Sequence, residues 1–291
     1  MKRNFFMHLL LVSGLFFLQL QENVVHAQSG WTQKKGELYS KIIHHHLQSN
    51  HYYNPAGMFS ITNEYKQNSV TLYGEYGLND KLTLLVDWPV LKRHGFETTE
   101  KISGYGDMKL GLKYAISKKV PISISLIPEL PIAKSDNYAQ NKQDPNTTFN
   151  LPTGDGEWNV YGILAISHSL RPLPVYINGY FSYNLRTSYG AISFGDQLNE
   201  GFELGWQPFT HIELRSGIKF QHSLSSSNEI ISFVRGEGTE YTSFFVGAFY
   251  GISDLWGIDI NYSDYFHSPQ KKKNLYAGAT ISAGMVYEIK K

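Results

Sequence analysis

Hydrophobic and polar residues alternate along much of this chain. In the stretch 106–117, GDMKLGLKYAIS, every second residue from Met108 to Ile116 is apolar, and the residues between them are small or charged. A period of two predicts a β-strand with one apolar face and one polar face. Such a strand fits a soluble sandwich, whose apolar face packs on a core, or a membrane barrel, whose apolar face contacts lipid.

Turn signals divide these runs into twelve strands, which we expect near residues 37–46, 68–77, 81–92, 106–117, 120–132, 157–170, 175–187, 197–208, 212–224, 240–252, 256–266 and 275–289. The connections alternate between short turns, such as Lys118-Lys119, and longer loops, of which 133–156 is the longest. Short turns on one rim, long loops on the other and an even strand number are typical of outer-membrane barrels. We therefore predict an all-β fold, a transmembrane antiparallel up-and-down β-barrel of about 12 strands.

Side-chain parity divides the strand residues into an outward apolar set and an inward polar set. Large rings also fall on the inward face and should narrow the lumen, because twelve strands lie between the eight that side chains fill and the sixteen that leave an aqueous pore. The candidates for lining the lumen are Tyr73, Glu75, Asp87, Asp107, Lys109, Lys113, Glu129, Tyr161, Tyr176, Tyr180, Glu203, Arg215, Lys219 and Asp259. Four tryptophans near strand ends are expected in the aromatic girdles at the membrane surfaces, namely Trp88, Trp158, Trp206 and Trp256.

The first residues have the pattern of a secretory signal. Two basic residues precede an apolar run that ends near Leu20, and small side chains lead up to Ala27. The run is short for a transmembrane helix and contains polar residues. We expect a signal peptide over 1–27, cleaved near Ala27, a short periplasmic segment over 28–36 and the outer-membrane barrel over 37–291.

Composition argues against several functions. The chain has 26 basic and 25 acidic residues, and this near balance removes the electrostatic basis for a nucleic-acid partner. It has no cysteine, so that disulfides, thiolate metal sites and thiol catalysis are ruled out. Its 20 tyrosines and 17 phenylalanines instead suit the aromatic girdles of a membrane barrel.

Three stretches resemble a known family. They are GYGDMKLGLKY (104–114), YGLNDKLTLLVDWPV (76–90) and TGDGEWNVYGILAIS (153–167). In these the chain is similar to a family of outer-membrane barrels associated with the meta-pathway of phenol degradation, which is similar in kind to the long-chain fatty-acid transporters. The resemblance implies passage of small aromatic or apolar compounds and supplies no catalytic residue. The chain departs from many such barrels in ending YEIKK rather than on an aromatic residue, with Tyr287 as a displaced signal.

Two histidine motifs suggest a metal site and a hydrolase, but neither motif has the further side chains that such a site requires. His44 and His46 share a strand face at a spacing that zinc can use, but no carboxylate lies at ligand spacing, so we expect no metal and leave the role of His44, His45 and His46 open. The pairs His168-Ser169 and His222-Ser223 are of the kind found in membrane-embedded lipid hydrolases. Because adjacent strand residues point to opposite faces, neither pair can act as base and nucleophile, and we expect no enzyme activity and no cofactor.

The expected function is a narrow channel or passive transporter for small organic solutes, aromatic or apolar in character. Its expected partners are these solutes, outer-membrane lipids and lipopolysaccharide, whose phosphates Lys271–Lys273 of the last loop could contact or leave solvated. We expect a monomer. The alternatives are a structural or surface-interaction barrel that presents the 133–156 loop and, third, a membrane-embedded lipid hydrolase.

Overall fold

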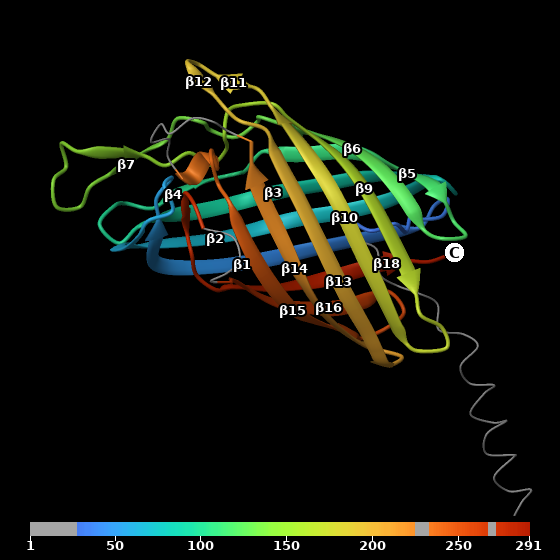
Figure 1. The fold of residues 1–291 in the computed structure, drawn as a ribbon. Helices are drawn as coiled ribbons and strands as arrows, with labels where there is room; N and C mark the ends of the chain where they lie inside the picture. The colour runs from blue at the N-terminus through green and yellow to red at the C-terminus, as the bar shows by residue number, and fades with distance from the viewer. Residues whose placement is uncertain (1–27, 225–232, 267–271) are drawn as a thin grey trace, which may run out of the picture.

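Twelve long antiparallel strands close into a barrel in the computed structural model, which describes residues 28–224, 233–266 and 272–291 (Figure 1). The barrel strands are β1 (Leu38–Tyr53), β2 (Phe59–Asn79), β3 (Leu82–Phe96), β5 (Met108–Ser117), β6 (Ile122–Leu130), β9 (Asn159–Ser169), β10 (Val175–Arg186), β13 (Gln197–Phe209), β14 (Ile212–Ser223), β15 (Tyr241–Gly251), β16 (Trp256–Tyr265) and β18 (Thr280–Ile289). Each pairs with the next along the chain, and β1 pairs with both β2 and β18. The predicted fold class and strand number are therefore confirmed.

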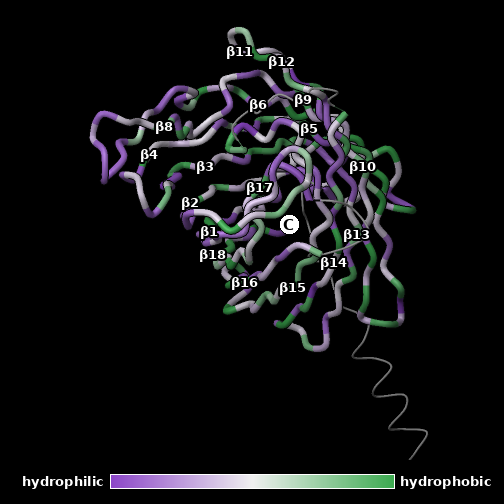
Figure 2. The backbone as a smooth tube through the Cα atoms, turned by 60° about the vertical axis from the view of Figure 1, so that its left-hand side comes forward, coloured by the Kyte–Doolittle hydropathy of each residue, from purple (hydrophilic) through white to green (hydrophobic). Residues whose placement is uncertain are grey.

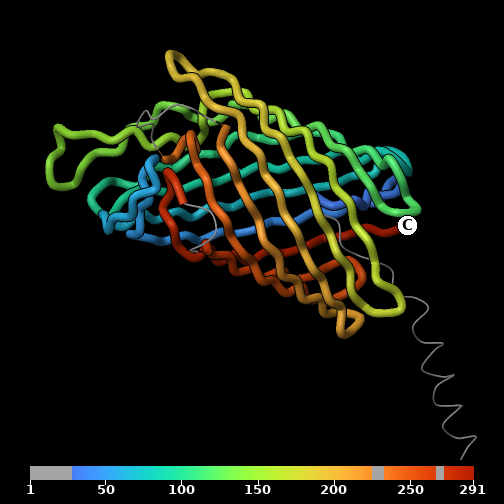
Figure 3. The backbone as a smooth tube through the Cα atoms, viewed as in Figure 1, coloured from blue at the N-terminus to red at the C-terminus, as the bar shows by residue number. Residues whose placement is uncertain are grey.

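The remaining elements are short and lie in the long loops. They are β4 (Ile102–Gly104), β7 (Tyr138–Gln140), β8 (Thr148–Asn150), β11 (Ser188–Tyr189), β12 (Ile192–Ser193), β17 (Leu275–Tyr276) and the 3-10 helix η2 (Phe233–Arg235). The hairpins β7–β8 and β11–β12 project from the same end of the barrel, opposite the end at which the short turns and the C-terminus lie (Figures 1 and 3). No helix in the described part of the chain is long and apolar enough to span a bilayer.

One loop is much shorter than the sequence prediction. Residues 47–67 were expected as a loop, but β1 continues to Tyr53 and β2 begins at Phe59. A tight turn joins them, in which the Asn54 side chain accepts a hydrogen bond from the Met58 amide at 2.9 Å and Gly57 adopts φ 79°. The Asn-Pro-Ala-Gly sequence of this turn is itself a strong turn signal, and β1 and β2 stay paired as far as Tyr53 and Phe59 on either side of it.

The outer wall of the barrel is apolar. Exposed side chains along the middle of the strands include Leu72, Leu112, Ile124, Leu126, Leu164, Ile166, Phe202, Leu204, Ile258 and Ile260. Buried polar side chains from the same strands include Glu75, Lys113, Asn159, Asn178, Asn184, Glu213, Arg215 and Asp259. Figure 2 shows hydrophobic and hydrophilic residues interspersed along the barrel strands. This inversion of the usual arrangement fits a lipid-facing exterior around a polar lumen.

Residues at the two chain ends differ in how they relate to the barrel. The expected signal peptide, 1–27, lies outside the described residues. Residues 28–36, expected as a short periplasmic segment, run into the barrel at the turn end, where Ser29 is fully buried. The C-terminal strand β18 pairs with β1 and β16, and its Tyr287 ring packs on Trp256 with 4.7 Å between ring centroids.

Depth in the bilayer gives a test of the outer wall. Leu112 lies at mid-strand and is 45% exposed, whereas Leu78 is 41% exposed at the turn end of β2. Leu112→Arg should destabilise the folded protein by roughly 2 to 4 kcal/mol in lipid, and Leu78→Arg by about 1 kcal/mol or less, because the cost of an outward charge falls toward the membrane surface. Equilibrium unfolding in lipid vesicles measures both. Equal costs would mean that the middle of this wall does not face lipid.

Candidate functional site: the barrel lumen

The N-terminal segment crosses the lumen at the turn end. The backbone oxygen of Gln28 accepts a hydrogen bond from Asn178 of β10 at 3.0 Å, and the Gly30 amide donates to Ser167 of β9 at 2.8 Å. Gly30 is required at this position, because a Cβ there would lie 2.1 Å from the Pro121 backbone oxygen. At the other end of the segment the Gly36 amide donates to Gly77 of β2. Since β2 and β10 lie on opposite sides of the barrel, the segment runs across the lumen and narrows it at this end.

A buried ion pair holds the middle of this segment. Lys113 and Glu75 have no exposed surface, and the Lys113 ammonium lies 3.2 Å from the Glu75 carboxylate. The same ammonium donates to the backbone oxygen of Trp31 at 3.0 Å, and the Trp31 ring packs edge-on against Tyr176. Tyr73 donates a hydrogen bond to Glu75. These inward residues therefore anchor the segment. Four of them were predicted to line the lumen, namely Tyr73, Glu75, Lys113 and Tyr176, and of these only Tyr73 borders the large cavities described next.

Two adjoining cavities occupy the middle of the lumen. The larger has a volume of about 500 Å³, and the smaller about 260 Å³. Tyr73, Asp87, Tyr180 and Lys219 border both of them. Of the other predicted lining residues, Glu203, Arg215 and Asp259 border the larger cavity, and Lys109 and Tyr161 border the smaller. The remaining five border neither cavity, namely Glu75, Asp107, Lys113, Glu129 and Tyr176.

Inward rings lie flat against the wall because glycines face them across the ladder. Tyr180 is paired in register with Gly201, and a Cβ on that glycine would lie 2.3 Å from the ring. Tyr176 covers Gly205 in the same way. A flat ring presents one π-face to the lumen instead of filling it, and so aromatic lining and open volume coexist.

Most charges in the lumen are paired. The ion pairs are Lys41–Asp259 (2.6 Å), Arg215–Asp259, Arg215–Glu213 (3.8 Å), and Lys109–Glu129 (3.7 Å). The Tyr176 hydroxyl donates to Glu203 at 2.9 Å, and the Tyr161 hydroxyl donates to Glu129 at 3.1 Å. Because the two signs alternate around the wall, the lumen offers no ring of a single charge that would select ions strongly.

One apolar patch interrupts this polar lining. Leu85, Ile127 and Ile163 come from β3, β6 and β9, face inward and are buried against one another. Tyr161 and Tyr180 pack on them, and all five border the smaller cavity. Sequence reasoning missed the three aliphatic residues, although their odd positions place them on the inward face of the predicted strands.

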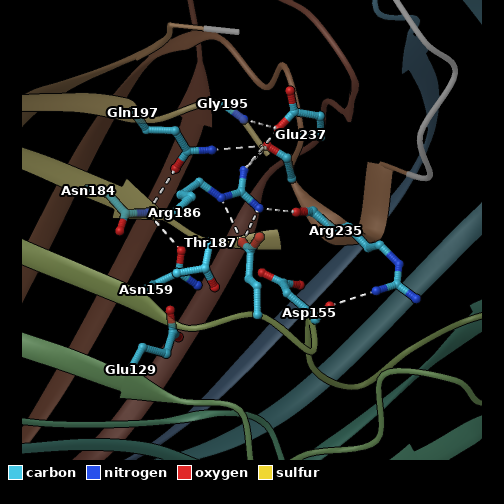
Figure 4. Close-up of polar contacts among 12 residues, drawn as sticks. Glu129, Asp155, Asn159, Asn184, Arg186, Thr187, Gly195, Gln197, Arg235 and Glu237 are labelled. Atoms are coloured by element: carbon cyan, nitrogen blue, oxygen red, sulfur yellow. Dashed lines mark hydrogen bonds and ion pairs between the residues drawn. The ribbon is translucent and has the colours of Figure 1, made fainter. Parts of the chain in front are cut away.

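At the loop end, a short segment after η2 crosses the mouth. Arg186, the last residue of β10, is buried and donates to Glu157 at 2.7 Å and to the Arg235 backbone oxygen at 2.8 Å. It also reaches the Gly236 oxygen and the Glu237 carboxylate. Figure 4 shows Arg186 directed at the Arg235 backbone oxygen and at Glu237, while Gln197 donates to the Gly236 backbone oxygen. On the β2–β3 side, Phe233 packs on other rings, so the segment is tied to both sides of the barrel. These rings are Tyr65, Phe96 and Tyr276.

Asp107 anchors the longest loop rather than lining a large cavity. Its carboxylate accepts hydrogen bonds from the Ala133 amide at 2.9 Å and the Asp155 amide at 2.8 Å. Only glycine fits at position 154, because a Cβ there would lie 2.3 Å from the Asp107 carboxylate oxygen. Arg235 completes the contact by donating to the Asp155 backbone oxygen at 2.6 Å. The 133–156 loop is therefore connected to the segment that crosses the mouth.

The four predicted girdle tryptophans are not equivalent. Trp158, Trp206 and Trp256 are 44–51% exposed on the outer wall, whereas Trp88 is half-buried and donates to the Gly106 backbone oxygen at 3.2 Å. Trp158 lies at the loop end, and Trp206 and Trp256 lie at the turn end.

The histidine and lysine motifs separate in the structure. His45 borders the larger cavity, whereas His46 contacts Asn68 at 2.9 Å. Within the described residues, no group of three or more histidine and acidic side chains could hold a metal. Lys272 is buried over the Tyr53 ring, and Lys273 pairs with Glu240 at 3.0 Å, so neither is a free loop cation. Lys271 lies outside the described residues.

The fold is similar to solved outer-membrane barrels. An outer-membrane channel from Pseudomonas putida F1 superimposes with a TM-score of 0.67 at 14% identity over 92% of this chain and 100% of that chain. The translocator domain of the autotransporter NalP from Neisseria meningitidis gives 0.50 at 10% identity, over 88% and 90%. The toluene transporter TodX of Pseudomonas putida gives 0.46 at 9%, over 87% and 89%. No protein-family model matches the chain, and neither does any curated protein. At these identities the likeness concerns the fold alone.

Asp155 gives the mouth a pH dependence. Burial, and then the nearby charge of Glu129, raise the pKa of Asp155 from 3.8 to about 7. Because the pKa of Asp155 is higher in the folded protein than in the unfolded chain, the protonated carboxyl group stabilises the loop. This contribution is complete below the pKa of the unfolded chain and is lost as pH rises through about 7. A spin label at Tyr138→Cys should therefore become more mobile between pH 5.5 and 8.5. In Asp155→Asn the mobility should be constant, and an unchanged pH response in that variant would contradict the assignment.

Proposed function

We propose that this chain spans the outer membrane and acts as a narrow passive channel for small aromatic or apolar solutes. The observation that carries the proposal is the central lumen, where flat rings and an inward aliphatic patch border two cavities between two constrictions. A wide porin would leave an aqueous pore, and a structural barrel would fill its interior with side chains. This lumen does neither.

The proposed outer-membrane location rests on the apolar outer wall of the barrel and on the signal-like sequence of residues 1–27. An apolar exterior on a closed strand ladder is stable in a bilayer, and β-barrels of this kind belong to outer membranes. A cleavable signal over 1–27 would deliver the chain, with the turn end and the 28–36 segment in the periplasm and the 133–156 loop outside. One chain closes the whole barrel wall, so that no second copy is needed to complete it, and we propose a monomer. The link to phenol degradation rests on the sequence resemblance and forms part of this proposal.

A structural or surface-interaction barrel is the second candidate. Segments cross the lumen at both ends, and the β7–β8 hairpin projects beyond the rim. A barrel built only to display this loop would need no open lumen. The cavities favour the channel, and flux measurements separate the two functions.

We expect the mature protein to fractionate with outer membranes and to migrate differently on a gel when unheated, since closed barrels resist detergent at room temperature. In planar bilayers its ion conductance should be small and weakly selective, and proteoliposomes should take up a small aromatic compound. A large porin-like conductance would contradict the narrow lumen. An absence of flux for every solute, even after deletion of residues 28–34, would favour the structural barrel.

The inward rings should set the bore. Tyr161→Ala with Tyr180→Ala should raise single-channel ion conductance, because these rings narrow the smaller cavity. Phe181→Ala is the matched control, because this ring lies next to Tyr180 in β10 but is exposed on the outer wall, and it should leave conductance unchanged. Equal effects of the inward and outward changes would show that the rings do not limit the path.

A further inference from the structure

One cation of the central lumen differs from the others in making neither an ion pair nor a hydrogen bond. Among the described residues, Lys219 of β14 makes no ion pair and no hydrogen bond through its ammonium, in contrast to the paired cations Lys41, Lys109, Lys113 and Arg215. Its side chain borders both central cavities, and the ammonium lies 5.3 Å from the Phe245 ring centroid. It is therefore open to whatever occupies the lumen.

The ladder explains why Lys219 stays unpaired. Its neighbours across the two adjacent strands are Gly201 and Ser243, which carry no charge. Glu203, two residues along β13, accepts the hydrogen bond of Tyr176. Asp87 borders the same cavities without forming an ion pair with Lys219, and its cross-strand neighbour Lys109 pairs with Glu129 instead.

The apolar patch lies on the wall of the cavity that Lys219 borders. The cavity of about 260 Å³ is bordered by Leu85, Ile127 and Ile163 and by the Tyr180 ring, together with Lys219. Tyr180 and Lys219 are separated across the ladder by Gly201 alone, which places their backbones about 10 Å apart. The volume is below the range of drug-sized pockets and suits a compact ligand. An apolar ring on the patch would leave its polar substituent facing the ammonium.

We propose that the lumen holds a binding site for monocyclic aromatic carboxylates, with the carboxylate on Lys219 and the ring against Tyr180 and the Leu85–Ile127–Ile163 patch. This inference rests on the proposed channel function and names its preferred solute class. A neutral aromatic compound can pack on the patch but leaves the Lys219 ammonium without a partner. The positive charge of an aromatic amine is repelled by that ammonium. The site therefore ranks benzoate above benzyl alcohol and benzyl alcohol above benzylamine.

Binding is measured first, because it does not require transport. Equilibrium dialysis of the purified full-length barrel in detergent should show saturable benzoate binding, which Lys219→Gln weakens by about tenfold or more, the loss expected for one charge-assisted hydrogen bond. Lys219→Arg should retain most of the affinity. Lys41→Gln removes the same charge from the larger cavity while Asp259 keeps Arg215, so this control should bind benzoate as the unmodified protein does. Heat-dependent gel mobility verifies that each variant is folded.

Two results would overturn the site: equal affinity for benzoate, benzyl alcohol and benzylamine, or equal losses in Lys219→Gln and Lys41→Gln. Uptake of the same compounds into proteoliposomes then separates this inference from the channel itself. Selective binding without uptake would support the site and contradict transport. Uptake of neutral aromatic compounds without selective benzoate binding would support the channel and contradict the site.

Discussion

Closure of the strand ladder is the constraint on which the rest of this structure depends. β1 pairs with β2 on one side and with β18 on the other, so that no strand edge is left unpaired in the barrel wall. In a bilayer each unpaired backbone group would cost several kcal/mol, and closure removes that cost. Once the ladder is closed, alternate residues of every strand must face either lipid or lumen, and the apolar exterior and polar interior follow from the sequence.

The lumen shows how a closed wall can keep open space. Glycines opposite inward rings let the rings lie flat, and ion pairs between adjacent or next-but-one strands neutralise most buried charge. The two crossing segments depend on the same devices, since Lys113 with Glu75 holds one and Arg186 with Glu157 holds the other. Removing one member of such a buried pair leaves an uncompensated charge, and so these pairs fix the constrictions as well as the wall.

Sequence patterning predicted the wall much better than the lumen. Period-two alternation located all twelve barrel strands, and the orientation of Leu112 and Lys113 follows from it directly. It could not show that residues 28–34 enter the barrel, because their contacts with Ser167 and Asn178 join segments far apart in the chain. It likewise assigned Asp107 to the lumen lining by parity, whereas the carboxylate binds the amides of Ala133 and Asp155. Parity gives the side of a residue, and tertiary contacts decide what it does there.

The central claim is that one face of each strand contacts lipid while the other bounds a polar lumen. Because the chain has no cysteine, single spin-labelled cysteines can be placed at residues 162–167 of β9 in lipid vesicles. Relaxation by lipid-dissolved oxygen should be strong at 162, 164 and 166 and weak at 163, 165 and 167. Reversed alternation, or uniform accessibility along the strand, would contradict the account.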